Sequence, residues 1–273
     1  MIGQKVLLER IGGQIERKKF PRFSILIGEK GSGKKTMAKD IAQMLGAMPV
    51  IVGIKAEDIR EIIDVSYKVT DTVVYIIADC DNMSSASANA LLKVTEEPPQ
   101  NAYFILTCEN EENLLSTIRS RGVTYMLEPY TYEDKCDYIQ YAFENISESD
   151  MEFMLDVAST PGELYYLADT NIQEFKDYIN LVVDNIAEVS DSNAFKIGDK
   201  VAFKDEPEKY DIKVFWKAFN AICVDRMRAG ENPLMYARAI GVTGDFAQQL
   251  NIRGINKQML FDNWIIAIRE EWV

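Results

Sequence analysis

Histidine is absent from this chain of 273 residues, and cysteine is scarce. The missing imidazole excludes Ser-His and Cys-His nucleophile pairs and the commonest general base of enzymes. The four cysteines stand too far apart for a C-x-x-C pair, and no histidine can complete a mixed metal site. We therefore expect no zinc, and reduced, buried thiols at Cys80, Cys108, Cys136 and Cys223.

Long apolar runs and a positive charge balance are lacking as well. No run reaches the length of about 18 residues that a membrane-spanning helix needs, and residues 1–20 show no apolar block of a signal peptide. The net charge of −13 repels nucleic acid, so DNA contact would need a local patch or basic partner subunits. Arg17-Lys18-Lys19 with Arg22 is such a patch, although a solvated helix end explains it equally well. We expect a cytoplasmic protein without membrane contact.

Apolar runs alternate with helical patterns over the first 128 residues, which is typical of a parallel sheet covered by helices on both faces. Ser84 or Ser85 is a plausible N-cap, and Pro98-Pro99 should stop the helix that follows it. Strands are expected at 23–27, 50–54, 73–78, 102–107 and 123–127. Helices are expected at 34–45, 56–67, 85–95 and 112–120.

Strand signals fade after Pro129, and the rest of the chain has helical patterns. Thr131 and Ser149 are candidate caps for short helices, and the polar stretch 190–207 should connect two longer ones. The short helices are expected at 131–143, 149–159 and 162–168. We predict three domains: an α/β domain at 1–128, a helical lid at 129–170 and an all-α domain at 171–273.

A glycine-rich loop joins the first expected strand to its helix, in the context where backbone N–H groups bind phosphate. Lys35 stands where a P-loop carries its magnesium-binding hydroxyl, and Thr36 lies about 100° further round an ideal helix. The loop should bind phosphate of ATP or ADP but is poorly suited to hydrolysis, and magnesium binding is left open. Its candidate residues are Gly28, Lys30, Gly31, Ser32, Gly33, Lys34, Lys35 and Thr36.

The run Ser87-Ala88-Asn89-Ala90-Leu91-Leu92-Lys93-Val94-Thr95-Glu96-Glu97-Pro98-Pro99, after the strand Val74-Tyr75-Ile76-Ile77, strongly resembles the bacterial clamp-loader AAA+ subunits of DNA polymerase III. The resemblance covers roughly residues 1–170 and implies an AAA+ P-loop NTPase-like sheet domain, a helical lid and a helical collar. Residues 102–107 are similar to the family's sensor-1 strand, which adds Thr107 to the nucleotide-binding candidates. Further similar stretches are Ile2-Gly3-Gln4, Ala56-Glu57-Asp58-Ile59-Arg60-Glu61 and Leu115-Ser116-Thr117-Ile118-Arg119-Ser120-Arg121.

Departures from the family pattern indicate a degenerate ATP site. Aligned on Asn89 to Lys93, the sequence puts Ala78 where motor subunits bind Mg²⁺ and Asp79 where they carry the catalytic glutamate. Glu163, after Pro161-Gly162, stands where they carry a second-sensor arginine. The cysteine-rich zinc module of the family is missing too, since residues 36–72 contain no cysteine.

Arg121 matches the arginine of the family's Ser-Arg-Cys segment, with Gly122 in place of the cysteine. The resemblance implies that Arg121 acts on the nucleotide of a neighbouring subunit, where such an arginine finger can raise the rate about 10³- to 10⁵-fold. The alternative is that Arg119 and Arg121 merely lie at a solvated helix end.

These features together resemble a delta-prime type subunit of the clamp loader, within a DNA polymerase holoenzyme and without efficient ATPase activity of its own. The implied partners are tau/gamma-like and delta-like subunits, the sliding clamp, and primer-template DNA through the complex. Two alternatives stay open: an active AAA+ ATPase in which Asp79 or Asp81 binds the metal, and an AAA+ scaffold that binds no nucleotide.

Overall fold

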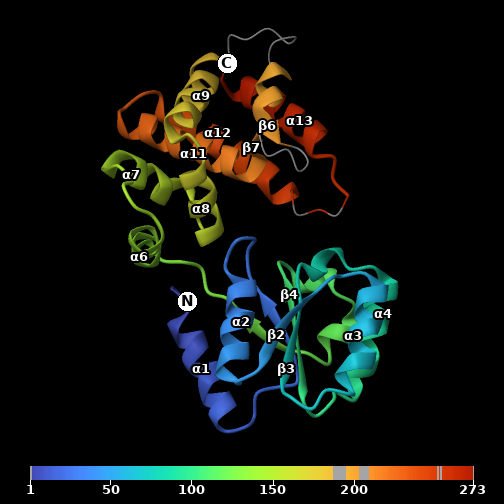
Figure 1. Cartoon of the computed structure of the whole chain (residues 1–273). Coiled ribbons are helices and arrows are strands. Elements are labelled where there is room, and N and C mark those ends of the chain that lie inside the picture. Colours follow the sequence, from blue (N-terminus) through green and yellow to red (C-terminus); the bar gives the residue numbers. More distant parts are fainter. Residues whose placement is uncertain (1, 187–194, 203–208, 251, 253, 273) are drawn as a thin grey trace. The chain divides into compact units, whose positions relative to one another are not determined.

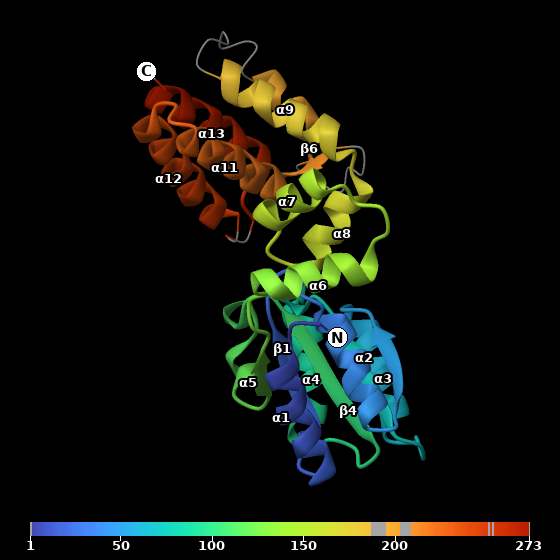
Figure 2. The same ribbon diagram turned by 90° about the vertical axis from the view of Figure 1, so that its left-hand side faces the viewer.

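The computed structural model describes residues 2–186, 195–202, 209–250, 252 and 254–272, and its ribbon is drawn in Figures 1 and 2. The chain forms two compact units. The first comprises Met1–Tyr141 with Thr160–Gly162, and the second comprises Ala142–Ser159 with Glu163–Val273. The predicted division into three domains stays a prediction.

A five-stranded parallel sheet forms the centre of the first unit, in the order β2-β3-β4-β1-β5. Every residue of β1 and β3 is buried, as expected of parallel strands covered on both faces. The edge strand β2 begins two residues before the expected range and contains Pro49, which an edge position tolerates. The strands are β1 (Phe23–Ile27), β2 (Met48–Val52), β3 (Val73–Ile77), β4 (Ala102–Cys108) and β5 (Val123–Met126).

Helices cover both faces of this sheet, as Figure 1 shows with α1 and α2 on one side and α3 and α4 on the other. Alternate strand residues feed two apolar clusters: Ile25 and Ile27 pack with residues of α3, α4 and α5, whereas Leu26 packs with residues of α1 and α2. The helices are α1 (Lys5–Glu16), α2 (Lys34–Met44), α3 (Ala56–Ser66), α4 (Ser85–Glu96), α5 (Ser116–Arg119) and α6 (Tyr132–Ala142). The predicted parallel α/β fold is confirmed.

Local capping explains where the expected helices begin and end. Ser84 caps α4 by accepting a hydrogen bond from Ser87 N at 3.1 Å, as one of the two predictions had it. The helix expected at 112–120 is wrong. The chain forms the 3₁₀ turn η2 (Glu111–Asn113) and the short α5, because Leu114 between them is extended and buries its side chain.

The second unit is mostly helical. Its core is a cluster of aromatic rings from α11 and α13. The ring centroid of Trp264 lies 5.1 Å from those of both Phe219 and Phe261. The indole N–H of Trp264 donates a hydrogen bond to Thr243 Oγ1 at 2.9 Å. The expected connection at 190–207 lies partly outside the described residues, and its described part forms η3 and β6. The elements are α7 (Glu148–Val157), α8 (Pro161–Asp169), α9 (Ile172–Asn185), η3 (Phe195–Lys200), β6 (Val201–Ala202), β7 (Tyr210–Asp211), α11 (Ile212–Arg228), α12 (Pro233–Gln249) and α13 (Lys257–Trp272).

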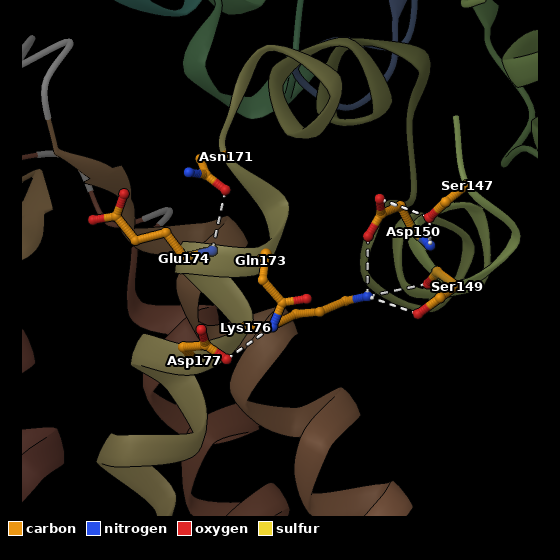
Figure 3. Close-up of polar contacts among 8 residues, drawn as sticks. All are labelled: Ser147, Ser149, Asp150, Asn171, Gln173, Glu174, Lys176 and Asp177. Atoms are coloured by element: carbon orange, nitrogen blue, oxygen red, sulfur yellow. Dashed lines mark hydrogen bonds and ion pairs between the residues drawn. The ribbon is translucent and has the colours of Figure 1, made fainter. Parts of the chain in front are cut away.

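Polar contacts tie α7 to α9 within this unit (Figure 3). Ser147, not the expected Ser149, caps α7 by accepting from Asp150 N at 3.1 Å, and this corrects the prediction because the helix begins one residue earlier. Lys176 from α9 reaches Asp150 Oδ1 at 3.3 Å and the Ser149 carbonyl at 3.1 Å. Asn171 caps α9 by accepting from the N–H of Glu174. Among the helices of the described residues, none has the length and apolar character that a membrane crossing requires.

Candidate nucleotide site and its arginine

The glycine loop connects β1 to α2 at the carboxyl edge of the sheet. Gly31 and Gly33 have φ angles of +81° and +87°, a left-handed conformation that glycine adopts without strain. The N–H of Ser32 donates to the Glu29 carbonyl at 3.1 Å and closes the turn. The loop thus has the strand–loop–helix geometry from which helix N–H groups can bind an anion.

Lys34 closes this loop from inside. Its Nζ donates to the carbonyl oxygens of Gly28 at 2.7 Å and Glu29 at 2.8 Å, and its side chain is buried. Burial lowers the pKa of Lys34, while the carboxylates of Glu109 and Asp79 oppose that shift. A phosphate at the loop would compete with the two carbonyls for this ammonium.

Three donors that lie far from the loop in sequence fix its backbone. Tyr130 donates to the Ser32 carbonyl at 2.8 Å, Thr160 to the Lys30 carbonyl at 3.2 Å, and Gly162 N to the Gly31 carbonyl at 2.9 Å. In a trans peptide group, the N–H points in the opposite direction to the carbonyl. The N–H groups of Gly31 and Gly33 therefore face away from the donors that bind the carbonyls of Lys30 and Ser32. The sequence analysis did not predict these three hydrogen bonds, and the Pro161-Gly162 pair after Thr160 was a signal that could have indicated the close contact with the loop.

The Ser32 hydroxyl lies inside the loop with unused hydrogen-bonding capacity. Ser32 is only 4% exposed, and within the described part of the chain its Oγ has no hydrogen-bond partner. A Cβ built on Gly28 would lie 2.8 Å from this oxygen, so the hydroxyl faces the start of the loop. Buried polar atoms are normally paired, so this orphan oxygen suits a ligand bound at the loop.

Lys35, Asp79 and Thr107 come together beside the loop, although they come from three separate segments. Lys35 Nζ lies 2.8 Å from Asp79 Oδ2 in an ion pair that is more than half exposed. Asp79 follows β3 with a left-handed φ of 56°, and its N–H donates to the buried Thr107 Oγ1 at 3.1 Å. Thr36 is exposed on α2, and Ala78 is half-buried just after β3.

These residues do not fit a magnesium ion. A P-loop binds Mg²⁺ through its Ser/Thr hydroxyl and a second-motif aspartate, but this chain has Lys35 and Ala78 at those positions. Of the carboxylates near the loop, Asp79 is paired with the Lys35 ammonium, and Asp81 accepts hydrogen bonds from the N–H groups of Glu109 and Asn110. In the described ranges, no group of three or more His, Cys, Asp or Glu side chains could hold a metal ion.

Arg121 lies at the amino ends of the strands of this sheet, whereas the glycine loop lies at their carboxyl ends. Arg121 lies two residues before β5, and the start of β5 pairs with the start of β1, so Arg121 is near the amino ends of the parallel strands. The glycine loop follows the other end of β1, about 16 Å away for a five-residue strand. The guanidinium donates to Glu96 Oε1 at 2.8 Å and to the Thr117 carbonyl at 3.0 Å.

Gly122 connects Arg121 to β5 and packs closely against β1. A Cβ at Gly122 would lie 2.6 Å from Ile25 Cδ1 and 3.1 Å from Phe23 Cε1, so a larger residue would disturb the buried start of β1. Glu163 belongs to the second unit, where its carboxylate pairs with Lys217 Nζ at 2.7 Å and accepts from Ser159 N at 2.8 Å.

Comparisons with known proteins agree with this fold. The family model described as DNA polymerase III, delta subunit, matches residues 47–131. The gamma subunit of DNA polymerase III from Buchnera aphidicola subsp. Schizaphis graminum is 29% identical over 194 residues, which are 58% of this chain and 53% of that subunit. The delta' subunit from Yersinia pestis is 39% identical over 71 residues, or 25% of this chain and 21% of that subunit. The chain thus spans about half the length of the gamma subunit and less of the delta' subunit.

Solved structures show the same architecture. A gamma subunit-related protein of DNA polymerase III from Thermotoga maritima superposes with a TM-score of 0.55 at 17% identity and covers 97% of this chain and 99% of its own. The RuvB Holliday junction branch migration motor of the same organism gives a TM-score of 0.52 at 17% identity, covering 96% and 88%. The fold is that of AAA+ P-loop proteins. The family model and the relatives make part of this chain similar to the clamp-loader subunits of DNA polymerase III.

Proposed function

We propose that this chain is a delta-prime type subunit of the clamp loader, which donates Arg121 to the ATP site of a neighbouring subunit and hydrolyses little ATP itself. The observation that carries the proposal is the placement of Arg121 at the amino edge of the sheet, with the glycine loop at the carboxyl edge. An arginine so placed is remote from its own loop. It can serve phosphate chemistry only in another molecule.

Release of Arg121 requires little free energy. Its ion pair with Glu96 is partly exposed, with 35% and 57% of the two side chains accessible, and exposed pairs contribute about 0–1 kcal/mol. A neighbour's γ-phosphate offers the guanidinium a more highly charged partner with matching oxygen geometry. Glu96 thus keeps Arg121 in place in the free subunit and yields it on assembly.

The proposed partners follow from the same role. Tau/gamma-like subunits would present the ATP that Arg121 contacts, and a delta-like subunit, the sliding clamp and primer-template DNA would complete the assembly. The net charge of −13 favours DNA contact through the other subunits rather than through this one. The chain would act in this assembly in the cytoplasm.

The test is the ATPase rate of the reconstituted loader with clamp and primed DNA. Arg121→Ala should lower turnover at the adjacent site by about 10³-fold or more, with assembly unchanged by light scattering. Arg119→Ala, an exposed arginine on α5, is the matched control and should leave the rate unchanged. Glu96→Gln should also leave the assembled rate intact, because it removes only the internal partner. Equal rates for Arg121→Ala and wild type would refute the finger.

One observation favours a motor subunit as the second candidate. The long alignment is with a gamma subunit, over 194 residues, whereas the delta' alignment covers 71. A motor would hydrolyse ATP as the isolated chain and lose that activity with Asp79→Asn. Absence of turnover in the isolated chain would eliminate this candidate.

A further inference from the structure

Lys35 adds a positive charge beside the glycine loop. It is the second residue of α2, directly after Lys34, and it occupies the position of the metal-binding hydroxyl in a P-loop. An ammonium group has three donors. Asp79 accepts one of them at 2.8 Å, and no hydrogen bond to a second acceptor is seen among the described residues.

The Asp79 carboxylate can pair with the Lys35 ammonium or bind a magnesium ion, but not both. Mg²⁺ requires near-octahedral oxygen coordination, yet Lys35 replaces the hydroxyl and Ala78 replaces the second-motif aspartate. A divalent cation beside Asp79 would also be repelled by the ammonium at ion-pair distance. The nucleotide would therefore have to leave its metal behind in order to bind.

The loop itself retains the features of an anion site. The Ser32 hydroxyl is buried and unpartnered within the described residues, and it faces the loop. The carbonyls of Lys30, Gly31 and Ser32 are held by outside donors, which keeps them from pointing at an anion. These two observations are independent of the helix N-terminus that follows the loop.

We propose that the loop binds the phosphates of a nucleoside diphosphate or triphosphate without Mg²⁺, with the Lys35 ammonium, held by Asp79, neutralising the charge that the metal would neutralise. The inference rests on the proposed function, because it assigns a task to the degenerate site of a subunit that does not hydrolyse ATP. The bound nucleotide would be structural and would persist through the cycle of the assembly.

The experiment measures binding of fluorescently labelled ADP to the isolated full chain, once in EDTA and once with excess magnesium. Wild type should bind in EDTA, and magnesium should weaken binding by about tenfold or more, since ADP must shed the ion. Lys34→Ala should abolish binding in both buffers, which locates it at the loop. Lys35→Thr should remove the penalty of magnesium.

Lys39→Thr is the matched control, because Lys39 is exposed on the same helix and the charge change is identical. It should keep the wild-type preference for EDTA. Circular dichroism melting checks that each variant is folded. Three results would overturn the inference: wild type that fails to bind in EDTA, binding that magnesium strengthens, or binding that survives Lys34→Ala. None of them bears on Arg121, whose test is the ATPase rate of the assembled loader.

Discussion

Gly162 and Gly31 meet backbone to backbone, and this contact allows a sharp test of how the loop is held. A methyl group on Gly162 would lie 2.5 Å from Gly31 Cα and 3.2 Å from the Gly31 carbonyl oxygen. Carbon atoms in contact normally stand about 3.5–4.0 Å apart, so Gly162→Ala must separate the segment from the loop by about 1 Å. The hydrogen bond from Gly162 N to Gly31 O, now 2.9 Å, would be weakened or lost.

The expected magnitude follows from three opposing contributions. Overpacking costs about 1–3 kcal/mol, and loss of the hydrogen bond costs about 1 kcal/mol. Alanine in the first turn of α8 returns up to about 1 kcal/mol of helix propensity. We expect Gly162→Ala to destabilise the contact by about 1–3 kcal/mol, which corresponds to about 5- to 150-fold faster amide exchange.

Hydrogen exchange of the residue 162 amide is the suitable assay, because a chain of two units need not unfold in one step. Gly241→Ala is the control: this glycine lies inside α12 and a methyl group there would meet nothing within 4 Å. The control should be stabilised by about 1 kcal/mol. If Gly162→Ala exchanged as slowly as wild type and were equally stable, the close approach of the two glycines would be refuted.

Two further predictions concern ionisable groups elsewhere. The hydrogen bond from the Ser147 hydroxyl, together with the Lys176 ammonium, lowers the pKa of Asp150. The stabilising contribution of the Asp150 carboxylate should therefore be present above the unfolded pKa of about 3.9 and lost as pH falls below it. Asp150→Asn should lower the denaturation midpoint at neutral pH, and a difference that persists in acid would contradict this. Burial raises the pKa of three thiols, those of Cys108 and Cys223 to about 12. A thiol reagent should therefore label only the half-buried Cys136 in the native protein and all four in denaturant, whereas rapid native labelling of more than one would be a contradiction.

The elements that sequence predicts well are those whose signal is local. The apolar runs of β1 and β3 are buried along their whole length, and Ser84 caps the helix that its hydroxyl predicts. The residues 112–120 show the limit of periodicity. A helical pattern there conceals Leu114, whose burial in an extended conformation breaks the helix in two.

The site could be predicted in its parts but not in its connections. The glycine loop and its unusual Lys35 are visible in the sequence. The ion pair of Lys35 with Asp79 joins residues 44 positions apart, and the bond from Tyr130 to Ser32 joins residues 98 apart. No local pattern encodes such contacts, because they depend on which strands become neighbours in the sheet.

The glycine loop and Arg121 lie at opposite ends of the strands of one parallel sheet, so the two ends of the first unit carry different functional groups. Under the proposed function, subunits of this kind would join through heterologous interfaces, which close into rings or continue without end unless something stops them. A copy whose arginine end works while its loop end has lost the metal ligands can be followed by a neighbour in only one direction. Under the proposed function, such a subunit would therefore stand at one end of a finite series.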